Sequence, residues 1–429
     1  MDDLIIGAPN ADPNGNRNAG ESYVVYGSDQ GFPANLELSN LNGNYGFTLN
    51  GVDGWDKSGI SVSGTGDVNS DGINDLIVGA DTEESYVVFG SDQGFPANLN
   101  LSTLNGSNGF TLKGIGETDL SGRSVSGTGD VNGDGINDLI IGADSEDPDG
   151  IKDAGESYVV FGKEEGFPAR VYVSTLDGSN GFTLRGIDKD DHSGTSVSDA
   201  GDINDDGFDD LIVGAYKADQ PKEVRDPGES YVVYGREGGF PDNLDLSSLN
   251  GNNGFKLNGI DDYDESGRSV SSAGDINSDG IDDLIIGAEN NDEGSYAVYG
   301  SASLGSPNER AINGTPAGDE LVGTAGNDQI VGDQGSDLIT SGGGSDDLVY
   351  KRLQDAGDTI TDFEVGNDEI VLTDLLDGLN YGASVQFRMV TSSWVRVAQV
   401  LMCSSTRVVR PVIAASGHSS KSKGSPQQI

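Results

Sequence analysis

One nine-residue pattern of oxygen-bearing side chains occurs four times in this chain, beginning at Asp67, Asp130, Asp202 and Asp275. The first copy reads Asp-Val-Asn-Ser-Asp-Gly-Ile-Asn-Asp, with carboxylate or amide oxygens at positions 1, 3, 5 and 9 and glycine at position 6. Position 7 can add its backbone carbonyl. Hard cations such as calcium take six to eight oxygen ligands, and this alternation wraps a short backbone around one ion. The pattern therefore predicts calcium loops.

The residues after each loop decide its structural context. Residues 75–80 read Asp-Leu-Ile-Val-Gly-Ala, and similar runs begin at 138, 210 and 283. Short β-branched runs closed by glycine are typical of strands. An EF-hand would continue into an amphipathic helix and would place a glutamate at position 12, where the first copy has Ile77 and Val78 instead. The sequence therefore argues against helical calcium motifs such as the EF-hand and the dockerin.

A longer repeat surrounds these loops. Its most regular part reads Ser-Tyr-Val-Val-Phe/Tyr-Gly, with a Tyr-Ala-Val variant, at intervals of 63, 72, 73 and 65 residues. Together with Ser-Val-Ser, Gly-Phe-Pro and Gly-Phe-Thr/Lys-Leu segments it gives about four strands per repeat. Such a unit, with no helical pattern between copies, predicts an all-β fold made of β-propeller blades. We favour this fold over a solenoid or a string of sandwiches. The copies lie at 22–27, 85–90, 157–162, 230–235 and 295–300.

These repeats resemble the FG-GAP repeats of the integrin α-subunit propeller. Phe89 and Gly90 supply the first part of that motif, residues 7–9 (Gly-Ala-Pro) supply the second, and the loops match the family's calcium loop with asparagine at position 3. The resemblance covers residues 2–300 and implies a cell-surface or secreted propeller that binds one calcium ion per loop. It implies these ligands at positions 1, 3, 5, 7 (carbonyl) and 9: Asp67, Asn69, Asp71, Ile73 and Asp75; Asp130, Asn132, Asp134, Ile136 and Asp138; Asp202, Asn204, Asp206, Phe208 and Asp210; Asp275, Asn277, Asp279, Ile281 and Asp283.

The repeat count differs from the seven blades that are usual in this family. Residues 1–8 align with the end of a loop whose front is absent, and the fifth copy stops after its third strand at Gly300. We count three complete blades over about 58–260 and two partial ones, which predicts a fragment of a longer protein with ring closure in doubt. The alternative is a small complete propeller closed by shared strands, but both partial blades supply strands two and three.

The sequence period changes to nine after a polar linker at 301–313. The new Gly-x-Asp-x-apolar repeat resembles the RTX parallel β-roll, which implies an apolar core and turn aspartates that bind calcium between stacked coils. About four copies are present, so the roll is short. The aspartates are Asp319, Asp328, Asp337 and Asp346, and the apolar residues are Leu321, Ile330, Ile339 and Leu348.

The segment 358–370 resembles the region that follows such repeats in proteins exported by type I secretion. This resemblance implies an uncleaved carboxyl-terminal export signal, which agrees with the absence of a charged-then-apolar signal peptide after Met1. We therefore expect the β-roll and the secretion-associated segment to occupy 314–376.

The remaining residues, 377–429, form a tail of different composition. All 72 acidic residues lie in 1–377, whereas the tail holds six of the 24 lysines and arginines and the only cysteine. We interpret this basic tail as disordered or frame-shifted sequence, in which case the export signal is damaged. The alternative is a tail that binds nucleic acid or a membrane.

The formal net charge of −48 limits the possible partners. It argues against a nucleic-acid-binding protein, because contacts to phosphates need cations, and it makes calcium the natural partner. Repulsion among the carboxylates opposes the compact state, so ion binding must offset it. The absence of cysteine from 1–402 gives no disulfide framework and is compatible with bacterial secretion. No apolar run approaches the roughly 20 residues of a membrane span.

The chain shows no recognisable catalytic group of residues. His192 and His418 are its only histidines, and a hydrolytic triad needs a histidine beside a nucleophile. We interpret His192 as a surface residue. Catalysis by paired carboxylates stays open, although no pair stands out from the repeats. We predict that the chain is not an enzyme.

Partner binding is expected on the face opposite the calcium loops. Alternating strand directions place the loops between strands 2 and 3 and between strands 4 and 1 on that face, and these loops vary between repeats. Loops on a rigid scaffold usually carry binding specificity, and in integrins this face carries ligand and partner contacts. The candidates are Trp55, His192, Tyr216 and Tyr263, with solvated loop residues as the alternative reading.

The combined prediction is a secreted, calcium-binding, integrin-like propeller that mediates cell adhesion or binds a matrix or surface partner, either a protein or a polysaccharide. The alternative is a fragment of an extracellular hydrolase or lyase whose catalytic part is missing.

Overall fold

The structure is a computed structural model of the chain. It describes residues 2–116, 119–219, 225–289, 294–302, 304, 310–323, 328–342, 346–350, 358–363, 369–371, 395–398 and 412–415. The chain divides into two compact units, Met1–Gly305 and Ser306–Ile429. Each unit is described by itself.

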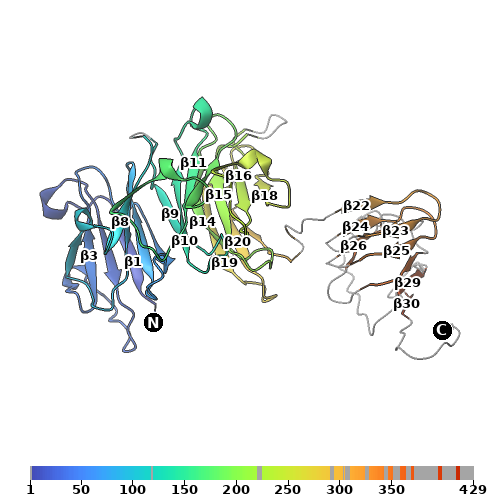
Figure 1. Ribbon diagram of the computed structural model, residues 1–429, viewed down its shortest axis with the longest axis horizontal. Coiled ribbons are helices and arrows are strands. Elements are labelled where there is room, and N and C mark those ends of the chain that lie inside the picture. The colour runs from blue at the N-terminus through green and yellow to red at the C-terminus, as the bar shows by residue number, and fades with distance from the viewer. Residues whose placement is uncertain are drawn as a thin grey trace. The chain divides into compact units, whose positions relative to one another are not determined.

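The first unit consists of five successive β-sheets, and Figure 1 shows the first and the last of them at opposite ends of the unit. In spatial order the sheets are β1-β2-β3-β7, β4-β5-β6-β8-β12, β9-β10-β11-β13-β17, β14-β15-β16-β18 and β19-β20-β21. This arrangement confirms the all-β fold class and is consistent with propeller blades.

The strands of this unit are β1 (Leu4–Ala8), β2 (Glu21–Val25), β3 (Gly46–Asn50), β4 (Ser61–Gly66), β5 (Asp75–Gly79), β6 (Glu84–Val88), β7 (Asn98–Asn100), β8 (Gly109–Lys113), β9 (Ser124–Gly129), β10 (Asp138–Ala143), β11 (Glu156–Val160), β12 (Arg170–Tyr172), β13 (Gly181–Arg185), β14 (Ser193–Gly201), β15 (Asp210–Ala215), β16 (Glu229–Val233), β17 (Asn243–Asp245), β18 (Gly254–Asn258), β19 (Ser269–Gly274), β20 (Asp283–Gly287) and β21 (Ser295–Val298). Short 3-10 helices lie at Pro13–Gly15, Leu38–Asn40, Leu101–Thr103, Pro148–Gly150, Val173–Thr175 and Leu246–Ser248.

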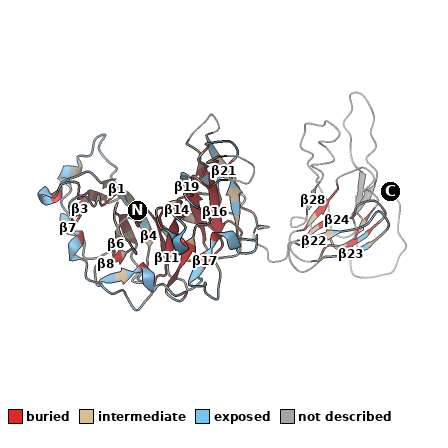
Figure 2. Cartoon of the chain, turned by 90° about the horizontal axis from the view of Figure 1, so that it is seen from above, coloured by how far each residue is buried: buried red, intermediate tan, exposed pale blue. Residues whose placement is uncertain are grey.

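The central strands of the middle sheets are apolar and are covered on both faces. Leu139, Ile140 and Ile141 are consecutive in β10, point to alternate faces, and are each at most 1% exposed. Ile140 belongs to the core shared with the following sheet, which contributes Leu211 and Val213. Figure 2 shows this burial along the strands of the middle sheets. Full burial of one such side chain contributes about 1.5–3 kcal/mol, so the packing of sheet on sheet is the main source of stability.

Three short strands cross from one repeat to the sheet of the preceding repeat, a connection that the sequence did not reveal. β7, β12 and β17 pair in parallel with β3, β8 and β13, respectively. The phenylalanine of the Gly-Phe-Pro segment that leads into each of these strands stacks on a phenylalanine of the preceding sheet, with ring centroids 4.2 Å apart for Phe95 on Phe47 and for Phe167 on Phe110. We call β7, β12 and β17 the staple strands.

The second unit is a short roll with two parallel sheets, β22-β24-β26-β28 and β23-β25-β27, the latter extended by β29 and β30. Its core contains the predicted nonapeptide residues Leu321, Ile330, Ile339 and Leu348, together with Ile360. Ile330 is in register with Leu348, and Leu321 with Ile339, so one coil spans two nonapeptides. The strands are β22 (Arg310–Asn313), β23 (Glu320–Val322), β24 (Asp328–Val331), β25 (Leu338–Thr340), β26 (Asp347–Val349), β27 (Thr359–Ile360), β28 (Glu369–Val371), β29 (Val395–Ala398) and β30 (Val412–Ala415).

Two sequence-based boundaries meet the structure here. Residues 310–313, assigned to the linker, form β22, because Ile312 pairs in register with Ile330 and packs against the roll core. The tail expected at 377–429 lies outside the described residues except for β29 and β30. Its assignment as disordered or frame-shifted sequence stays a prediction.

Candidate calcium sites

Each predicted calcium loop connects the first two strands of a sheet, namely β4 to β5, β9 to β10, β14 to β15 and β19 to β20. The glycine at position 6 has φ between +86° and +95° in all of them, a conformation that glycine adopts without steric cost. Position 4 is also left-handed, with φ of 59° at Ser70 and 65° at Ser278. The sequence did not indicate this, because only the second loop has a glycine there, Gly133.

Backbone amides fix the polar side chains inside each loop. Asp67 Oδ1 and Oδ2 accept the N–H groups of Asp71 at 3.0 Å and Gly72 at 2.7 Å. Asn69 Oδ1 also accepts the Asp71 N–H, and Asp71 Oδ1 accepts the Ile73 N–H, both at 3.0 Å. The other loops repeat these bonds. Positions 1, 3 and 5 therefore gather around the same few backbone groups.

The aspartate at position 9 is buried and held from two sides. Asp138 is 0% exposed, and its carboxylate accepts the N–H of Val131 at 3.1 Å and of Gly162 at 2.9 Å. Burial raises the pKa of Asp138 to about 8, against the lowering effect of these two hydrogen bonds. For the same leading cause the pKa of Asp75 is raised to about 7 and that of Asp210 to about 8. The position-9 carboxylate is therefore a buried anion that gains from a proton or a cation.

The glycine of each Phe-Gly segment, such as Gly162 after Phe161, is needed for a close backbone contact with the calcium loop. Gly162 donates its N–H to Asp138. A Cβ at Gly162 would lie 2.3 Å from the Asn137 carbonyl oxygen and 2.5 Å from Ile136 Cγ2. Only glycine lets this backbone approach the loop closely enough to hold the carboxylate.

The donor set of the loops fits calcium. Carboxylate, side-chain amide and backbone carbonyl oxygens are the ligands that calcium takes. In the part of the chain that the structure describes, no three carboxylate, imidazole or thiolate groups converge into a closed cage. This is expected from the loop chemistry, because position 3 is an amide, position 7 contributes a carbonyl, and position 9 is turned toward two backbone amides. The individual ligand assignments stay predictions.

Neighbouring loops are hydrogen-bonded to each other, which sequence reasoning missed. The side chain at position 8 of one loop accepts the N–H of position 1 in the preceding loop. The lengths are 3.1 Å for Asn137 and Asp67, 2.7 Å for Asp209 and Asp130, and 3.2 Å for Asp282 and Asp202. The glycine before position 1 makes room, since a Cβ at Gly66, Gly129 or Gly201 would lie within 2.5 Å of these side chains. A polar residue at position 8 and a glycine before position 1 in every copy were the available signal.

The nonapeptide aspartates of the second unit form two columns along the roll. In one column Asp319 N–H donates to Asp337 Oδ1 at 2.8 Å, and Asp337 N–H donates to Asp358 Oδ1 at 2.9 Å. In the other, Asp328 N–H donates to Asp346 Oδ1 at 2.8 Å. Asp358, which the sequence placed in the export-associated segment, thus extends the first column.

Buried oxygens in the first column fit a cation. Asp337 Oδ2 and Asp358 Oδ2 are buried and have no hydrogen-bond partner among the described residues. Both approach Gly332, where an added Cβ would lie 2.6 Å and 3.1 Å from them. Burial raises the pKa of Asp358 to about 6. Uncompensated buried carboxylate oxygens are costly, and calcium is a hard cation that would satisfy them.

The face opposite the calcium loops carries pairs of loops with one recurring contact. In three repeats the loop that leads into the next sheet lies against an earlier loop of the same face. A residue of the first loop donates its backbone N–H to the backbone carbonyl of a basic residue in the earlier loop. The two side chains of each pair are also in contact: the first pair forms a cation–π contact, the second an ion pair and the third a hydrogen bond. We call these the loop pairs: Arg17 and Trp55, Lys152 and Asp190, Arg225 and Tyr263.

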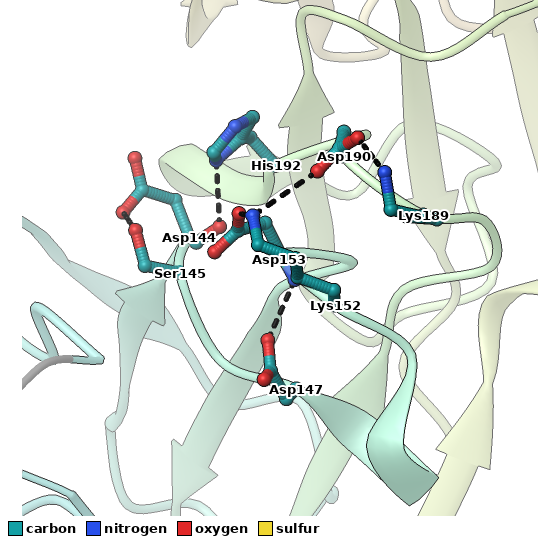
Figure 3. A network of polar contacts seen from close by, with 8 residues as sticks. All are labelled: Asp144, Ser145, Asp147, Lys152, Asp153, Lys189, Asp190 and His192. Atoms are coloured by element: carbon teal, nitrogen blue, oxygen red, sulfur yellow. Dashed lines mark hydrogen bonds and ion pairs between the residues drawn. The ribbon is translucent and has the colours of Figure 1, made fainter.

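Two of the predicted partner-binding residues, His192 and Tyr216, are brought together by the structure. Their ring centroids are 5.7 Å apart, His192 Nδ1 lies 3.0 Å from the Asp144 carbonyl oxygen, and the Arg268 guanidinium lies 4.6 Å from the Tyr216 ring centroid. Figure 3 shows His192 beside Asp144 and the neighbouring loop pair of Lys152 and Asp190. The other two candidates, Trp55 and Tyr263, belong to separate loop pairs.

Two repeat families match the chain at these sites. The FG-GAP repeat matches residues 58–93, 121–160, 194–233 and 266–301, which contain the four calcium loops. The RTX calcium-binding nonapeptide repeat, in four copies, matches residues 313–348, which contain Asp319, Asp328, Asp337 and Asp346. The chain carries FG-GAP repeats and RTX nonapeptides.

Relatives of this FG-GAP and RTX chain include integrin alpha subunits. Integrin alpha pat-2 of Caenorhabditis elegans is 30% identical over 242 residues, which are 54% of this chain and 18% of the relative. Integrin alpha-IIb of Mus musculus is 33% identical over 174 residues, 37% of this chain and 15% of the relative. Phosphatidylinositol-glycan-specific phospholipase D of Bos taurus is 33% identical over 152 residues, 33% of this chain and 16% of the relative. The chain spans less than a fifth of the length of these relatives.

These similarities identify calcium as the cofactor and indicate an adhesion-like propeller with an extracellular or surface location. Both repeat families are typically non-enzymatic. Within the described residues, no helix has the length and apolar character that a transmembrane helix needs.

Proposed function

We propose that this chain is a calcium-dependent adhesion module that binds a surface protein or a polysaccharide through its loop pairs. The integrin relatives and the FG-GAP repeats support adhesion. The calcium loops lie at the other ends of the same strands, so bound ions stiffen the scaffold that presents the loop pairs.

The observation that carries this proposal is the strained, outward geometry of the loop pairs. Trp55, Asp190 and Tyr263 have φ of 78°, 66° and 63°. A residue other than glycine in this region costs of order 1–3 kcal/mol. Trp55 is 56% and Tyr263 46% exposed. Aromatic side chains that are held outward at such a cost are suited to contact a partner, and aromatic and arginine residues dominate binding energy at interfaces.

The export route is part of the same proposal. The RTX match supports type I secretion, with the propeller at 1–300, a linker that ends before β22, and the roll and its following segment reaching 376. The roll folds on meeting extracellular calcium, because its buried aspartates need a cation.

The test is a binding screen of the immobilised chain against glycans and matrix proteins, in calcium and in chelator. We expect a ligand that binds only in calcium, and a loss of at least about fivefold in affinity for Tyr263→Ala, the scale of an interface anchor residue. Tyr172→Ala is the matched control, since Tyr172 is also 46% exposed but lies on β12. Equal losses for both variants, or binding that ignores calcium, would contradict the proposal.

A second candidate is the non-catalytic part of an extracellular hydrolase. The similarity to the bovine phosphatidylinositol-glycan-specific phospholipase D favours it. Binding of the chain to vesicles that carry a glycosylphosphatidylinositol-anchored reporter, and not to vesicles without the anchor, would support this candidate, whereas the adhesion proposal predicts no dependence on the anchor.

A further inference from the structure

The last sheet of the first unit exposes apolar residues whose equivalents are buried in the second, third and fourth sheets. Ile276, Ile285 and Tyr299 are 54%, 44% and 59% exposed. The residues at the same repeat positions are 0% to 6% exposed: Val68, Val131 and Ile203; Ile77, Ile140 and Ile212; Phe89, Phe161 and Tyr234. We call the surface of Ile276, Ile285 and Tyr299 the trailing face. It has the composition of an interior surface that the next sheet covers.

The polar groups of a sheet-to-sheet joint are also present at the trailing face. In each of the three joints among the second to fifth sheets, the following sheet uses the N–H of position 1, the carbonyl of position 2 and the hydroxyl of a first-strand serine of the preceding sheet. Between the third and fourth sheets these bonds are Asp209 Oδ2 to Asp130 N at 2.7 Å, Arg236 N to Val131 O at 2.9 Å, and Val197 N to Ser124 Oγ at 2.9 Å. The other two joints repeat all three bonds.

The equivalent groups of the last sheet belong to Ser269, Asp275 and Ile276. The difference between the last sheet and the covered sheets is clearest at the glycine before position 1. A Cβ at Gly129 would lie 2.0 Å from the Asp209 side chain of the next sheet, whereas a Cβ at Gly274, which has a similar φ of +60°, would have no described heavy atom within 4 Å.

The chemistry of the joint defines what can cover the trailing face. The occupant must bring a side-chain acceptor one residue before the position-9 aspartate, and apolar residues on the second strand. The first sheet has these features. Asp2 precedes Asp3, whose Oδ1 accepts the Gly27 N–H at 2.8 Å as Asp138 accepts that of Gly162. Leu4 of β1 is 58% exposed, while its equivalent Leu139 is 1% exposed.

We propose that the trailing face binds the first sheet of a second copy of this chain, so that copies associate head to tail. The joint would reuse the contacts to the position-1 N–H and to the position-2 carbonyl, whereas the serine contact needs a first strand that the described first sheet, β1-β2-β3-β7, does not contain. Such an interface joins two different surfaces, so it continues into longer assemblies or closes into a ring rather than stopping at a dimer. The net charge of −48 opposes association, so calcium and moderate salt favour it. This inference is independent of the ligand of the loop pairs.

Sedimentation velocity of the full chain in calcium tests the proposal. We expect the average mass to rise beyond a dimer with increasing protein concentration. Ile285→Lys removes the trailing face and Leu4→Lys removes the first-sheet face, so each variant alone should stay monomeric. An equimolar mixture of the two should form dimers and nothing larger, because each copy then offers one intact surface.

The matched control is Ile115→Lys, since the 54% exposure of Ile115 lies between those of Ile285 at 44% and Leu4 at 58%, but Ile115 lies in the connection between β8 and β9. It should assemble like the unmodified chain. Circular dichroism and calcium binding should be unchanged in all three variants, because the substituted side chains are exposed. A chain that stays monomeric at every concentration, as it would if residues 306–429 covered the face, would overturn the proposal. So would assembly of Leu4→Lys alone, which would mean that two trailing faces pair with each other.

Discussion

Asn137 Oδ1 accepts the backbone N–H of Asp67 at 3.1 Å, so one calcium loop completes the hydrogen bonding of the loop 70 residues before it. The Asn137 N–H also donates to the Asp67 carbonyl at 3.3 Å. Position 1 of each loop that has a following sheet is thereby fixed by its neighbour. Ion binding in adjacent loops is expected to be coupled through this contact.

Asn137→Ala should lower the free energy of unfolding by about 1 kcal/mol, because it leaves the Asp67 amide without its side-chain acceptor. Urea unfolding in calcium measures the change. Asn74→Ala is the matched control, since Asn74 is the exposed asparagine at the same position of the first loop, and its effect should stay within about 0.5 kcal/mol. Equal effects of the two variants would mean that the inter-loop bond contributes nothing.

The propeller should bind at least four calcium ions, one for each loop from Asp67 to Asp283. Calorimetric titration of chelator-treated protein with calcium gives the number of sites. We expect dissociation constants of about 10⁻⁴ to 10⁻³ M, the range of extracellular modules. Asp71→Ala should remove one site and leave the others, because it deletes the oxygen at position 5 of one loop. Two or fewer sites in residues 1–300 would show that the loops are metal-independent turns.

The pH dependence of stability should reverse when calcium is added. The pKa of Asp138 is raised from 3.8 to about 8 by burial, so between these values the folded metal-free chain holds more protons than the unfolded chain. Its stability therefore falls as pH rises from about 4 to about 8. Calcium binding needs the deprotonated carboxylate and should strengthen over the same range.

Unfolding midpoints at several pH values, in chelator and in calcium, measure both slopes. Asp138→Asn should flatten the slope in chelator, whereas the exposed Asp92→Asn should leave it unchanged. A metal-free chain that becomes more stable from pH 5 to pH 8 would contradict the burial argument.

Gly162→Ala should destabilise the chain by about 2 kcal/mol, a typical cost of forcing a methyl group into a close-packed site. The added Cβ would meet the Asn137 carbonyl oxygen at 2.3 Å and displace the N–H that holds Asp138. Gly64→Ala is the control, because a Cβ there has no heavy atom within 4 Å. Thermal unfolding of both variants in calcium gives the comparison, and a similar midpoint for the two would refute the assigned purpose of the Phe-Gly glycine.

The RTX segment should be unfolded at cytosolic calcium and fold at about 10 mM calcium, well above the affinity range of extracellular modules. Its small core cannot offset the ordering of its backbone at about 1–2 kcal/mol per residue, and the buried Asp337 and Asp358 oxygens need a cation. Circular dichroism of the 301–378 peptide measures the transition. Asp337→Ala should raise the calcium concentration needed, and an equal β signal in chelator would exclude the switch.

The features that could be predicted from the sequence are those that repeat locally. Two motifs allowed the sheets and the roll to be predicted, namely the loop from Asp67 to Asp75 and the nonapeptide at Asp319. Each has a regular spacing of oxygen ligands together with a regular spacing of apolar residues, and each occurs several times. The staple strands could not be found this way. Residues 98–100 pair in parallel with β3, which lies 50 residues earlier, and a pairing over that distance leaves no signal in the local sequence.

Features that depend on distances between sheets were equally hidden. The side chain of Asp209 reaches Asp130 only because of how two sheets pack. Asp358 follows Asp337 by 21 residues, whereas Asp337 follows Asp319 by 18, so the insertion concealed its place in the column.

The staple strands also determine where the chain can be divided without breaking a sheet. A sheet such as β4-β5-β6-β8 becomes five-stranded only when residues 170–172 of the next repeat are added, and Phe167 of that repeat stacks on its Phe110. A folded sheet therefore takes four strands from one sequence repeat and its fifth strand from the next repeat. During synthesis a sheet is complete only after the next repeat has been made. An engineered boundary between two sequence repeats would therefore remove the edge strand and the stacked phenylalanine that the next repeat supplies to the preceding sheet.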